Sequence, residues 1–274
     1  MRTHGCIHSG SDLGADAHAC WGFDRRQEFV DAALEFLTDG LRGGQRIVYV
    51  GSEPVAEQRE RLEPLGGVGA MIDEGALLLI DLTGIYKAGE PLDPHAQMGV
   101  YAAVTDAALA DGYSGIRVAA QVTNLVTEPS TWDAHLRWES MADRFMSVQP
   151  MSAMCGYQRD LVPEQLLSEL SALHPASNAP DKTVPFRLFA EDGEMVLSGD
   201  VDFISVKALD RALETACDGT EPVVFDLRDL GFIDPNGLEV LARHTRRLAA
   251  ESGCSVRNAP PPVERLCQIL DVVL

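Results

Sequence analysis

Short, almost wholly apolar runs alternate with amphipathic stretches before residue 174, and this alternation limits the possible folds more than any other feature. Five runs read as strands buried on both faces: HACWGF, RIVYVG, ALLLID, GIRVAA and MSAMCGY. The stretches between them have helical periodicity, and residues 25–41 place Phe29, Phe36 and Leu37 on one face. Buried strands that alternate with helices are typical of parallel sheets. The sequence therefore predicts an α/β layer fold around a mostly parallel sheet.

A break follows at residues 174–185, HPASNAPDKTVP, where three prolines and small residues interrupt the periodicity. Beyond it, FRLFAEDGEMVLSGDVD reads as two strands around an Asp-Gly turn, and helix, strand, helix, strand and helix patterns follow. We therefore expect four segments: a flexible N-terminus (1–16), a large α/β domain (17–175), a linker (176–183) and a smaller α/β domain (184–274).

Charge and composition exclude several classes of protein. The formal net charge of −20 would repel a phosphate backbone, so we expect no nucleic-acid partner. No apolar run approaches the roughly 18 residues of a membrane span, and the first residues do not resemble a secretory signal. The six cysteines are scattered without a C-x-x-C pair, which favours reduced thiols. These features indicate a cytoplasmic protein without a membrane partner.

The second domain contains a strand-to-helix turn, GFIDPNG, within FDLRDLGFIDPNGLEVL. Together with LSGDVDFISVKAL and NAPPPVERLCQIL, this stretch resembles the STAS domain of anti-sigma factor antagonists over residues 184–274. The resemblance implies a partner, an anti-sigma factor of the histidine-kinase-like ATPase type, and hence control of sigma-dependent transcription. In the family pattern, D-S-S-G-L, that kinase phosphorylates the second serine.

Here the matching turn reads Asp234, Pro235, Asn236 and Gly237, so Asn236 replaces the phosphorylated serine. One hypothesis is that neutral Asn236 keeps the domain in the unphosphorylated, partner-competent form. The alternative is that a domain without the serine no longer binds an anti-sigma kinase, or that the turn only caps a helix. Ser205 matches a second position that some relatives phosphorylate, but a simple helix N-cap is the favoured explanation.

Residues 17–175 resemble the MEDS sensory domain, on three pieces of sequence: residues 18–53, GIRVAAQVTNL, and the long stretch from WESMADRF to SALHP. The resemblance implies a three-layer α/β fold related to RecA and KaiC that became a sensor, predicted to bind simple hydrocarbon derivatives. A KaiC-type nucleotide hydrolase is the enzymatic alternative. It is disfavoured because GSEPVAEQ, after RIVYV, lacks the second glycine and the lysine of a phosphate loop. Without a phosphate loop, Asp81 is expected to cap a turn rather than bind a magnesium ion.

Candidate ligand-binding residues lie on two of the predicted strands. His18 and Cys20 are two residues apart and share one face, and Cys155 and Tyr157 repeat that relation. Glu139 and His174 also match the family pattern. A pocket with these groups could bind a polar head group; a zinc or copper ion, an oxidised thiol pair, or plain core packing are the alternatives. We assign no cofactor and no resident metal from the sequence.

The sequence as a whole predicts a signalling regulator without enzymatic activity, in which a sensory domain controls an antagonist-like domain. The alternative is a ligand-sensing scaffold that takes part in a larger signalling complex without binding an anti-sigma factor. The ligand, the sigma factor, the sign of regulation and the oligomeric state stay open.

Overall fold

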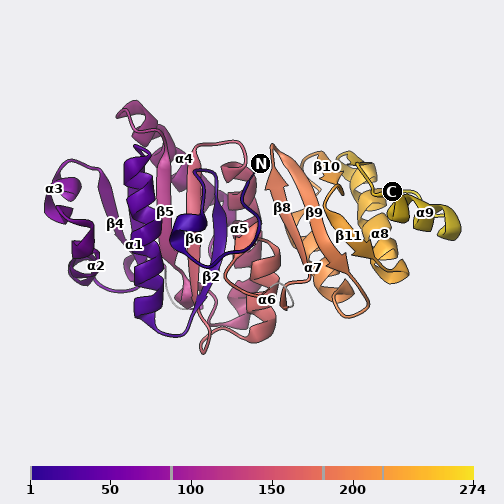
Figure 1. The fold of residues 1–274 in the computed structure, drawn as a ribbon, viewed down its shortest axis with the longest axis horizontal. Coiled ribbons are helices and arrows are strands. Elements are labelled where there is room, and N and C mark those ends of the chain that lie inside the picture. The colour runs from indigo at the N-terminus through magenta and orange to yellow at the C-terminus, as the bar shows by residue number, and fades with distance from the viewer. Residues whose placement is uncertain (1, 87–88, 181–182, 218) are drawn as a thin grey trace.

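The computed structural model describes residues 2–86, 89–180, 183–217 and 219–274. Within these residues the chain forms two α/β domains, each built around its own sheet, and the helices α5 (Trp132–Met146) and α6 (Glu164–Ala172) lie between the two sheets (Figure 1). The predicted α/β class, with a large mostly parallel sheet and a smaller second domain, is confirmed.

The N-terminal domain contains a parallel sheet of seven described strands in the order β1-β7-β2-β6-β5-β3-β4. Their bounds are β1 Gly5–Cys6, β2 His18–Phe23, β3 Arg46–Gly51, β4 Leu77–Asp81, β5 Ile116–Gln121, β6 Met151–Gln158 and β7 Ala176–Ser177. The five apolar runs correspond to β2 to β6. The short strands β1 and β7 were not predicted, because two residues carry no periodicity.

Helices cover both faces of this sheet and make three layers. The helices α1 (Arg26–Arg42), α2 (Val55–Leu62) and α3 (Val68–Asp73) lie on one face, and α4 (Pro94–Ala110), α5 and α6 lie on the other. Successive strand residues point to opposite faces of the sheet: Ile47 and Tyr49 pack on the α1 side, whereas Val48 and Val50 pack on the α5 side. Cys20 belongs to the α5 side as well, and this alternation directs the candidate site residues toward α5.

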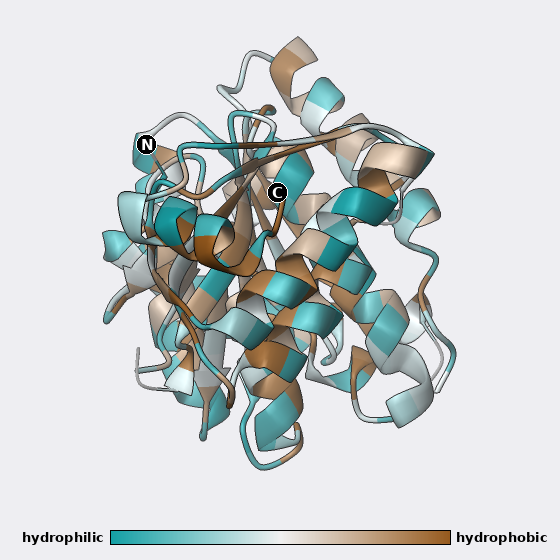
Figure 2. Ribbon diagram, turned by 90° about the vertical axis from the view of Figure 1, so that its right-hand side faces the viewer, coloured by the Kyte–Doolittle hydropathy of each residue, from teal (hydrophilic) through white to brown (hydrophobic). Residues whose placement is uncertain are grey.

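The C-terminal domain has five described strands: β8 Phe186–Glu191, β9 Glu194–Val201, β10 Val223–Asp226, β11 Leu230–Ile233 and β12 Cys254–Arg257. β9 pairs antiparallel with β8 and parallel with both β10 and β11. Three helices complete the domain: α7 Val206–Ala216, α8 Pro235–Glu251 and α9 Pro261–Leu270. Figure 2 looks onto this end of the molecule, where hydrophobic and hydrophilic residues alternate along the helices, as expected for helices with one face on a core.

The predicted Asp-Gly hairpin turn is present, because Asp192 and Gly193 adopt the positive φ angles (51° and 81°) of a two-residue turn. The strand β11 was missed. Its four residues, LGFI, stand between the strand β10 and the turn before α8, where the sequence suggested only a loop.

The segment expected to link the domains is packed against them. Residues 176–177 form β7 beside β2, and the side chain of Asn178 bonds both backbone groups of Gly22, at 2.8 Å and 2.7 Å. Positions 181 and 182 of this segment lie outside the described residues. A single hydrophobic core runs from the α5 side of the large sheet into the C-terminal domain. The two domains therefore contact each other extensively through α5, α6, α7 and β8.

The N-terminal residues differ from the flexible segment that the sequence suggests. Arg2 is 3% exposed, β1 pairs with β7, and Ile7 and Leu13 are buried against α1. Gly10 lies so close to α1 that a Cβ atom there would stand 2.1 Å from the carbonyl oxygen of Ala32. The stretch has no periodicity, but its isolated apolar residues and one glycine are enough to fix it to the core.

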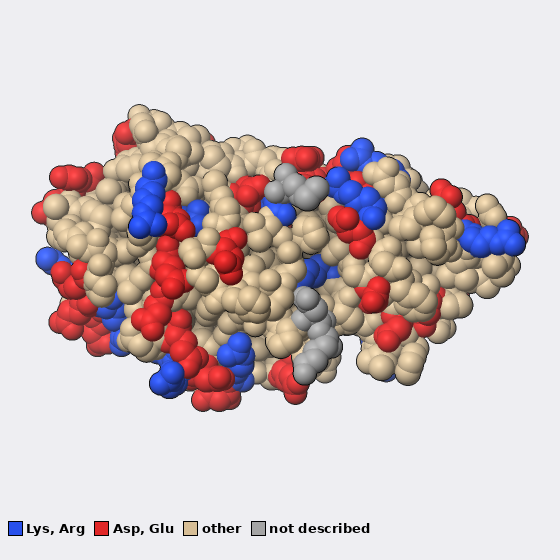
Figure 3. All heavy atoms as spheres, viewed as in Figure 1, with Lys and Arg blue, Asp and Glu red and all other residues tan. Residues whose placement is uncertain are grey.

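Acidic side chains gather over the region of α1 and α2, with basic side chains among them, on the face shown in Figure 3. In the part of the chain that the structure describes, no helix combines the length and the apolar character needed to cross a membrane.

The fit of Gly10 predicts a measurable loss of stability on adding one methyl group. Gly10→Ala should lower the free energy of unfolding by about 1–3 kcal/mol, because the backbone of α1 must shift to admit the Cβ. Gly84→Ala is the control, since nothing lies within 4 Å of a Cβ there. Urea denaturation of both variants measures the difference, and equal stabilities would show that residues 2–16 do not pack on the core.

Candidate functional site

Four buried polar side chains meet between the large sheet and α5: His18, Glu139, Cys155 and His174. His18 begins β2, Cys155 lies in β6, Glu139 lies on α5, and His174 follows α6. One donor atom from each lies within 4.8 Å of the donors of the other three. All four side chains are buried, so this four-residue cluster is a polar site inside a mainly apolar layer.

The local structure explains why these residues meet. β2 and β6 are parallel neighbours with Cys20 beside Cys155, so the α5-facing residues of both strands form adjacent rows. On α5, His135, Glu139 and Asp143 recur every four residues and therefore form one polar stripe. This stripe is buried and faces the two rows. The strand period of two and the helix spacing of four therefore bring residues that are distant in the sequence together at one point.

The contacts in the cluster are short and centre on one oxygen atom, Oε2 of Glu139. This atom lies 3.1 Å from Nε2 of His18, 3.4 Å from Sγ of Cys155 and 3.4 Å from Nε2 of His174. Sγ of Cys155 lies 3.7 Å from Nε2 of His18. The rings of His18 and His174 are 4.0 Å apart between centroids.

Neighbouring groups outside the cluster bond its residues and fix their orientation. Nδ1 of His18 lies 3.1 Å from Oδ1 of Asp143, and Nδ1 of His174 lies 2.7 Å from the carbonyl oxygen of Leu170. The hydroxyl of Tyr157 donates to the other oxygen of Glu139, Oε1, at 2.6 Å and also lies 2.8 Å from Nε2 of His135. Both histidines therefore have Nδ1 engaged outside the cluster and direct Nε2 into it.

Charges in this buried site depend strongly on one another. Burial alone would raise the pKa of Glu139, but the imidazoles of His135, His174 and His18 beside its carboxylate hold that pKa well below its usual range. Burial would lower the pKa of His18, but the carboxylates of Asp143 and Glu139 more than offset burial and raise it. Burial and the neighbouring His18 lower the pKa of His174. Glu139 is thus an anion that the surrounding histidines stabilise.

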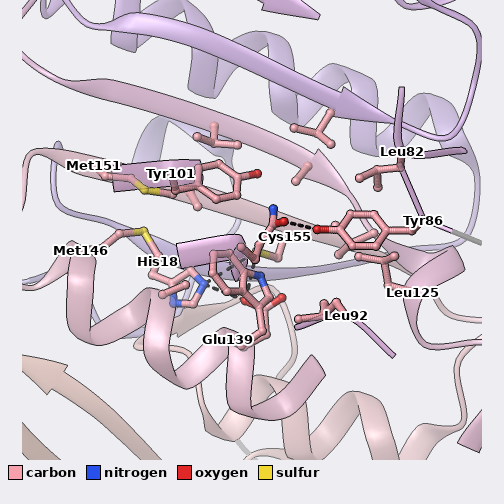
Figure 4. Close-up of a pocket in the computed structure, with 18 residues that line it drawn as sticks. His18, Leu82, Tyr86, Leu92, Tyr101, Leu125, Glu139, Met146, Met151 and Cys155 are labelled. Carbon is pink, nitrogen blue, oxygen red and sulfur yellow. Dashed lines mark hydrogen bonds and ion pairs between the residues drawn. The ribbon is translucent and has the colours of Figure 1, made fainter. Parts of the chain in front are cut away.

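A small, mainly apolar cavity of about 30 Å³ adjoins the cluster (Figure 4). His18, Glu139 and Cys155 contribute to its wall, and Tyr86 and Tyr101 place aromatic rings around it. The hydroxyl of Tyr86 donates to the side chain of Gln97. The remaining lining is mostly aliphatic or sulfur-containing and includes Leu82, Leu92, Leu125, Met146 and Met151. The cavity therefore suits a small apolar molecule with one polar group directed at the cluster.

Of the six predicted pocket residues, Cys20 and Tyr157 lie beside the four-residue cluster rather than in it. Cys20 accepts a hydrogen bond from Ser171 at 3.5 Å, and Tyr157 supports Glu139. Cys20 and Cys155 are register partners, and both thiols are free. Burial raises the pKa of Cys20 to about 12, and burial with the nearby Glu139 raises the pKa of Cys155. Because oxidation proceeds through the thiolate, these shifts disfavour the redox alternative.

The turn at residues 234–237 lies on the C-terminal domain and is separate from the cluster. Asp234 is the N-cap of α8, since its Oδ1 accepts from the backbone N–H of Gly237 at 2.7 Å, and Pro235 begins the helix. Asn236 is exposed in the first turn of α8 and is not the cap.

The candidate Ser205 is in a different position from an ordinary cap. It precedes α7, but its side chain makes no bond to the first turn of that helix. Its hydroxyl instead accepts from the N–H of Asp202 at 2.9 Å and lies 3.1 Å from Oδ1 of Asp202. The prediction of a side-chain cap at Ser205 was wrong, because the Ser205 hydroxyl is bonded to Asp202. The carboxylate of Asp202 itself accepts from the N–H groups of Ile204 and Ser205.

Large apolar side chains are exposed near this turn. Phe203 and Ile204 are 72% and 75% exposed, and Phe232 on β11 is 51% exposed. The N–H of Asp234 bonds the carbonyl of Val201 at the end of β9, so the loop at 202–205 and the turn at 234–237 share one edge of the sheet. We call Phe203, Ile204, Phe232 and the turn at residues 234–237 the turn surface.

Two links connect the four-residue cluster to β8 of the C-terminal domain. Asp143 bonds His18 through Oδ1 and accepts from the backbone N–H of Ala190 through Oδ2 at 2.6 Å. Arg187 on β8 donates to the carbonyl of His174 at 3.3 Å. Sequence reasoning missed Asp143 and Arg187. The spacing of four from His135 through Glu139 to Asp143 was the available signal for Asp143.

The nucleotide-hydrolase alternative has little support from the geometry. Only Asp24 and Arg25 separate β2 from α1, and three residues without a glycine separate β3 from α2, so neither turn is a phosphate loop. Asp81 caps the turn that follows β4, accepting from the N–H and the hydroxyl of Thr83 at 2.8 Å and 2.6 Å.

Comparison with protein families matches two models in the expected order. The model "MEthanogen/methylotroph, DcmR Sensory domain" matches residues 17–175, and the model described as "Mlab, STAS domain" matches residues 186–273. Both resemblances are thereby confirmed. No curated protein matches the chain. Among solved structures, the flagellar accessory protein FlaH from Methanocaldococcus jannaschii is 13% identical with a TM-score of 0.40, over 66% of this chain and 75% of that one. With more than half of its length matched by the first model, the chain belongs to the MEDS family, and a STAS domain follows its sensory domain.

Proposed function

We propose that this protein is a signalling regulator in which a small molecule in the MEDS pocket changes how the STAS domain binds a protein partner. The observation that carries the proposal is the pair of links from the pocket cluster to β8, through Asp143 and Arg187. The role is binding rather than catalysis.

The pocket supports a sensory role because of its chemistry. Its lining is mainly apolar apart from the cluster and the Tyr86–Gln97 pair, and the cavity of about 30 Å³ admits only a small group. Such a site favours a short hydrocarbon derivative whose single polar atom meets His18 or Cys155. The same chemistry matches the ligand class that the MEDS resemblance implies.

The links to β8 provide a route by which pocket occupancy reaches the STAS domain. β8 is bonded to β9 on one side, and at Ala190 its other edge is covered by two side chains. Asp143 accepts from the N–H of Ala190, and Arg2 donates to its carbonyl at 2.5 Å. A ligand that moves His18 therefore acts on a carboxylate that also holds β8. Coupling requires the ligand to bind two arrangements of this contact with different affinity.

The turn surface supports a partner-binding role for the STAS domain. Three large apolar side chains stand exposed around the first turn of α8, and a monomer gains nothing from exposing them. We propose that the partner is an anti-sigma factor of the histidine-kinase-like ATPase type. Asn236 is neutral and exposed where relatives carry a phosphorylated serine, so the turn keeps the uncharged form that the partner recognises.

Adding a charge at the turn tests this assignment without damaging the fold. Asn236→Asp should weaken partner binding by at least about tenfold, or about 1.4 kcal/mol, because it imitates the charge of a phosphorylated serine. The same change places an anion in the first turn of α8, where the helix dipole favours it by about 0.3–1 kcal/mol. It also replaces the amide of Asn236, which donates to Asp234 at 3.5 Å, with a carboxylate that Asp234 repels. The two effects on stability oppose each other, so stability should change little while partner binding falls.

The measurement is a pull-down from source lysate with the full chain as bait, followed by mass spectrometry and titration of the captured ATPase. Gln27→Glu, the same type of change at an exposed position of α1, is the control and should bind like the native chain. Capture of no such ATPase by the native chain, or equal capture by the Asn236→Asp chain, would contradict the assignment.

The route through Asp143 predicts a local effect in the STAS domain. Asp143→Asn should accelerate amide hydrogen exchange at Ala190, because one amide oxygen cannot serve His18, Arg2 and the Ala190 N–H together. It should also cost about 3–5 kcal/mol of stability, since Arg2 keeps a buried charge without its partner.

Asp133→Asn is the matched control for this experiment. It makes the same change on the same helix, but Asp133 is 77% exposed in its ion pair with Arg211. Its loss should cost no more than about 1 kcal/mol and leave exchange at Ala190 unchanged. Unchanged exchange in the Asp143→Asn chain as well would refute this route between the domains.

A further inference from the structure

The four-residue cluster has the composition of a metal site as well as that of a pocket wall. It combines two imidazoles, one thiol and one carboxylate, each with a single donor atom turned inward. The donors come from two strands, one helix and the segment after α6, all of which are fixed in the core. Such a set on rigid elements is preorganised, so an ion would find its ligands already in place.

The distances between the donors suit tetrahedral coordination. With metal–nitrogen and metal–oxygen bonds of about 2.0–2.2 Å and a metal–sulfur bond of about 2.3 Å, neighbouring donors of a tetrahedron stand about 3.3–3.7 Å apart. Four of the six donor pairs stand at 3.1 Å (His18–Glu139), 3.4 Å (Cys155–Glu139 and His174–Glu139) and 3.7 Å (Cys155–His18). The two pairs that His174 makes with His18 and Cys155 lie within 4.8 Å. Small adjustments would suffice to place an ion at their centre.

Outer groups orient the ligands in the way that metal sites require. Metal-binding histidines commonly use the second ring nitrogen to donate to a carboxylate or a backbone carbonyl, which fixes the tautomer. His18 uses Asp143 for this purpose, and His174 uses the carbonyl of Leu170. Tyr157 occupies Oε1 of Glu139 and leaves Oε2 for the centre.

The inward nitrogen of His174 is the least satisfied polar atom of the cluster. Among the described residues it has no hydrogen-bond partner, although Oε2 of Glu139 lies only 3.4 Å away. In the neutral ring, the hydrogen is on Nδ1 for Leu170, so Nε2 presents a lone pair to a carboxylate oxygen. Two electron pairs that face each other in a buried site repel, and a cation between them removes the repulsion.

Charge also balances around a divalent ion. A thiolate from Cys155 and the carboxylate of Glu139 neutralise two positive charges, with both histidines neutral. The nearby Asp143 is already paired with Arg2 at 2.9 Å. A divalent ion would therefore leave no uncompensated charge in a region where such a charge is costly.

We propose that His18, Glu139, Cys155 and His174 bind one Zn²⁺ ion in a tetrahedral site at the polar end of the pocket. Zinc accepts nitrogen, sulfur and oxygen donors in four-coordinate sites. The carboxylate disfavours Cu⁺, which prefers softer ligands, and the thiolate disfavours Mg²⁺ and Ca²⁺. This site does not depend on the proposed signalling role, because it concerns the ion alone.

Titration of the metal-free full chain with Co²⁺ tests the site directly. We expect one Co²⁺ per chain, with the intense visible absorption of tetrahedral cobalt and a thiolate-to-cobalt charge-transfer band in the near ultraviolet. Zn²⁺ should abolish both signals by displacement and raise the temperature of unfolding. Weak binding with the faint spectrum of six-coordinate cobalt would overturn the proposal.

Two pairs of variants assign the ligands. Cys155→Ser should abolish the charge-transfer band, whereas Cys267→Ser, on α9, should keep it. His174→Gln should lower the affinity for Co²⁺ at least about tenfold, whereas His95→Gln, at an exposed position on α4, should not. If Cys155→Ser retained the band, or both histidine variants bound like the native chain, the ion would lie elsewhere and the assignment would fail. The cobalt titration does not involve the protein partner, so neither result bears on the signalling proposal, which the pull-down tests.

Discussion

The fully buried carboxylate of Asp143 joins three parts of the molecule that are distant in the sequence. It accepts from the ring of His18 and from the N–H of Ala190, and it pairs with the guanidinium of Arg2. A buried anion is costly unless charge and hydrogen bonds compensate it, and here all its partners come from other elements. The arrangement of the N-terminal segment, the pocket and β8 therefore depends on one ionised group on α5.

The four-residue cluster and the turn surface are built in opposite ways. In the cluster, polar atoms are buried, bonded to one another and fixed by neighbours, so a change of occupancy must alter several contacts together. At the turn surface, apolar side chains are exposed around a capped helix end, so the surface can be covered or released without rearranging the core. The cluster and the turn surface are joined through β8 and β9, an arrangement that suits the proposed roles of input and output.

The strands and helices with strong periodicity could be predicted from the sequence, because burial on one or two faces directly constrains residue type. The two-residue strands β1 and β7 have too few positions to show a period, and the six-residue helix α3 completes less than two turns. His18 and Cys155 could be predicted as pocket residues from the strand period and the family resemblance. For Asp143 the available signal was its spacing of four from Glu139, whereas Arg2 could not be predicted, because a charged residue in a sequence gives no sign of burial until its partner is known. The expectation of a flexible N-terminus failed for the same reason.

The contacts of Arg2 have a consequence for the order of events during synthesis. Its side chain and backbone bond Ala190 and Glu191, so its final position does not exist until β8 has left the ribosome. At the usual rate of translation that delay is about 10–40 s. His18 likewise waits for His174, the last cluster residue to emerge. The sensory domain therefore cannot complete its core before the chain has entered the STAS domain, and a nascent chain must hold its first residues unpaired for most of its synthesis.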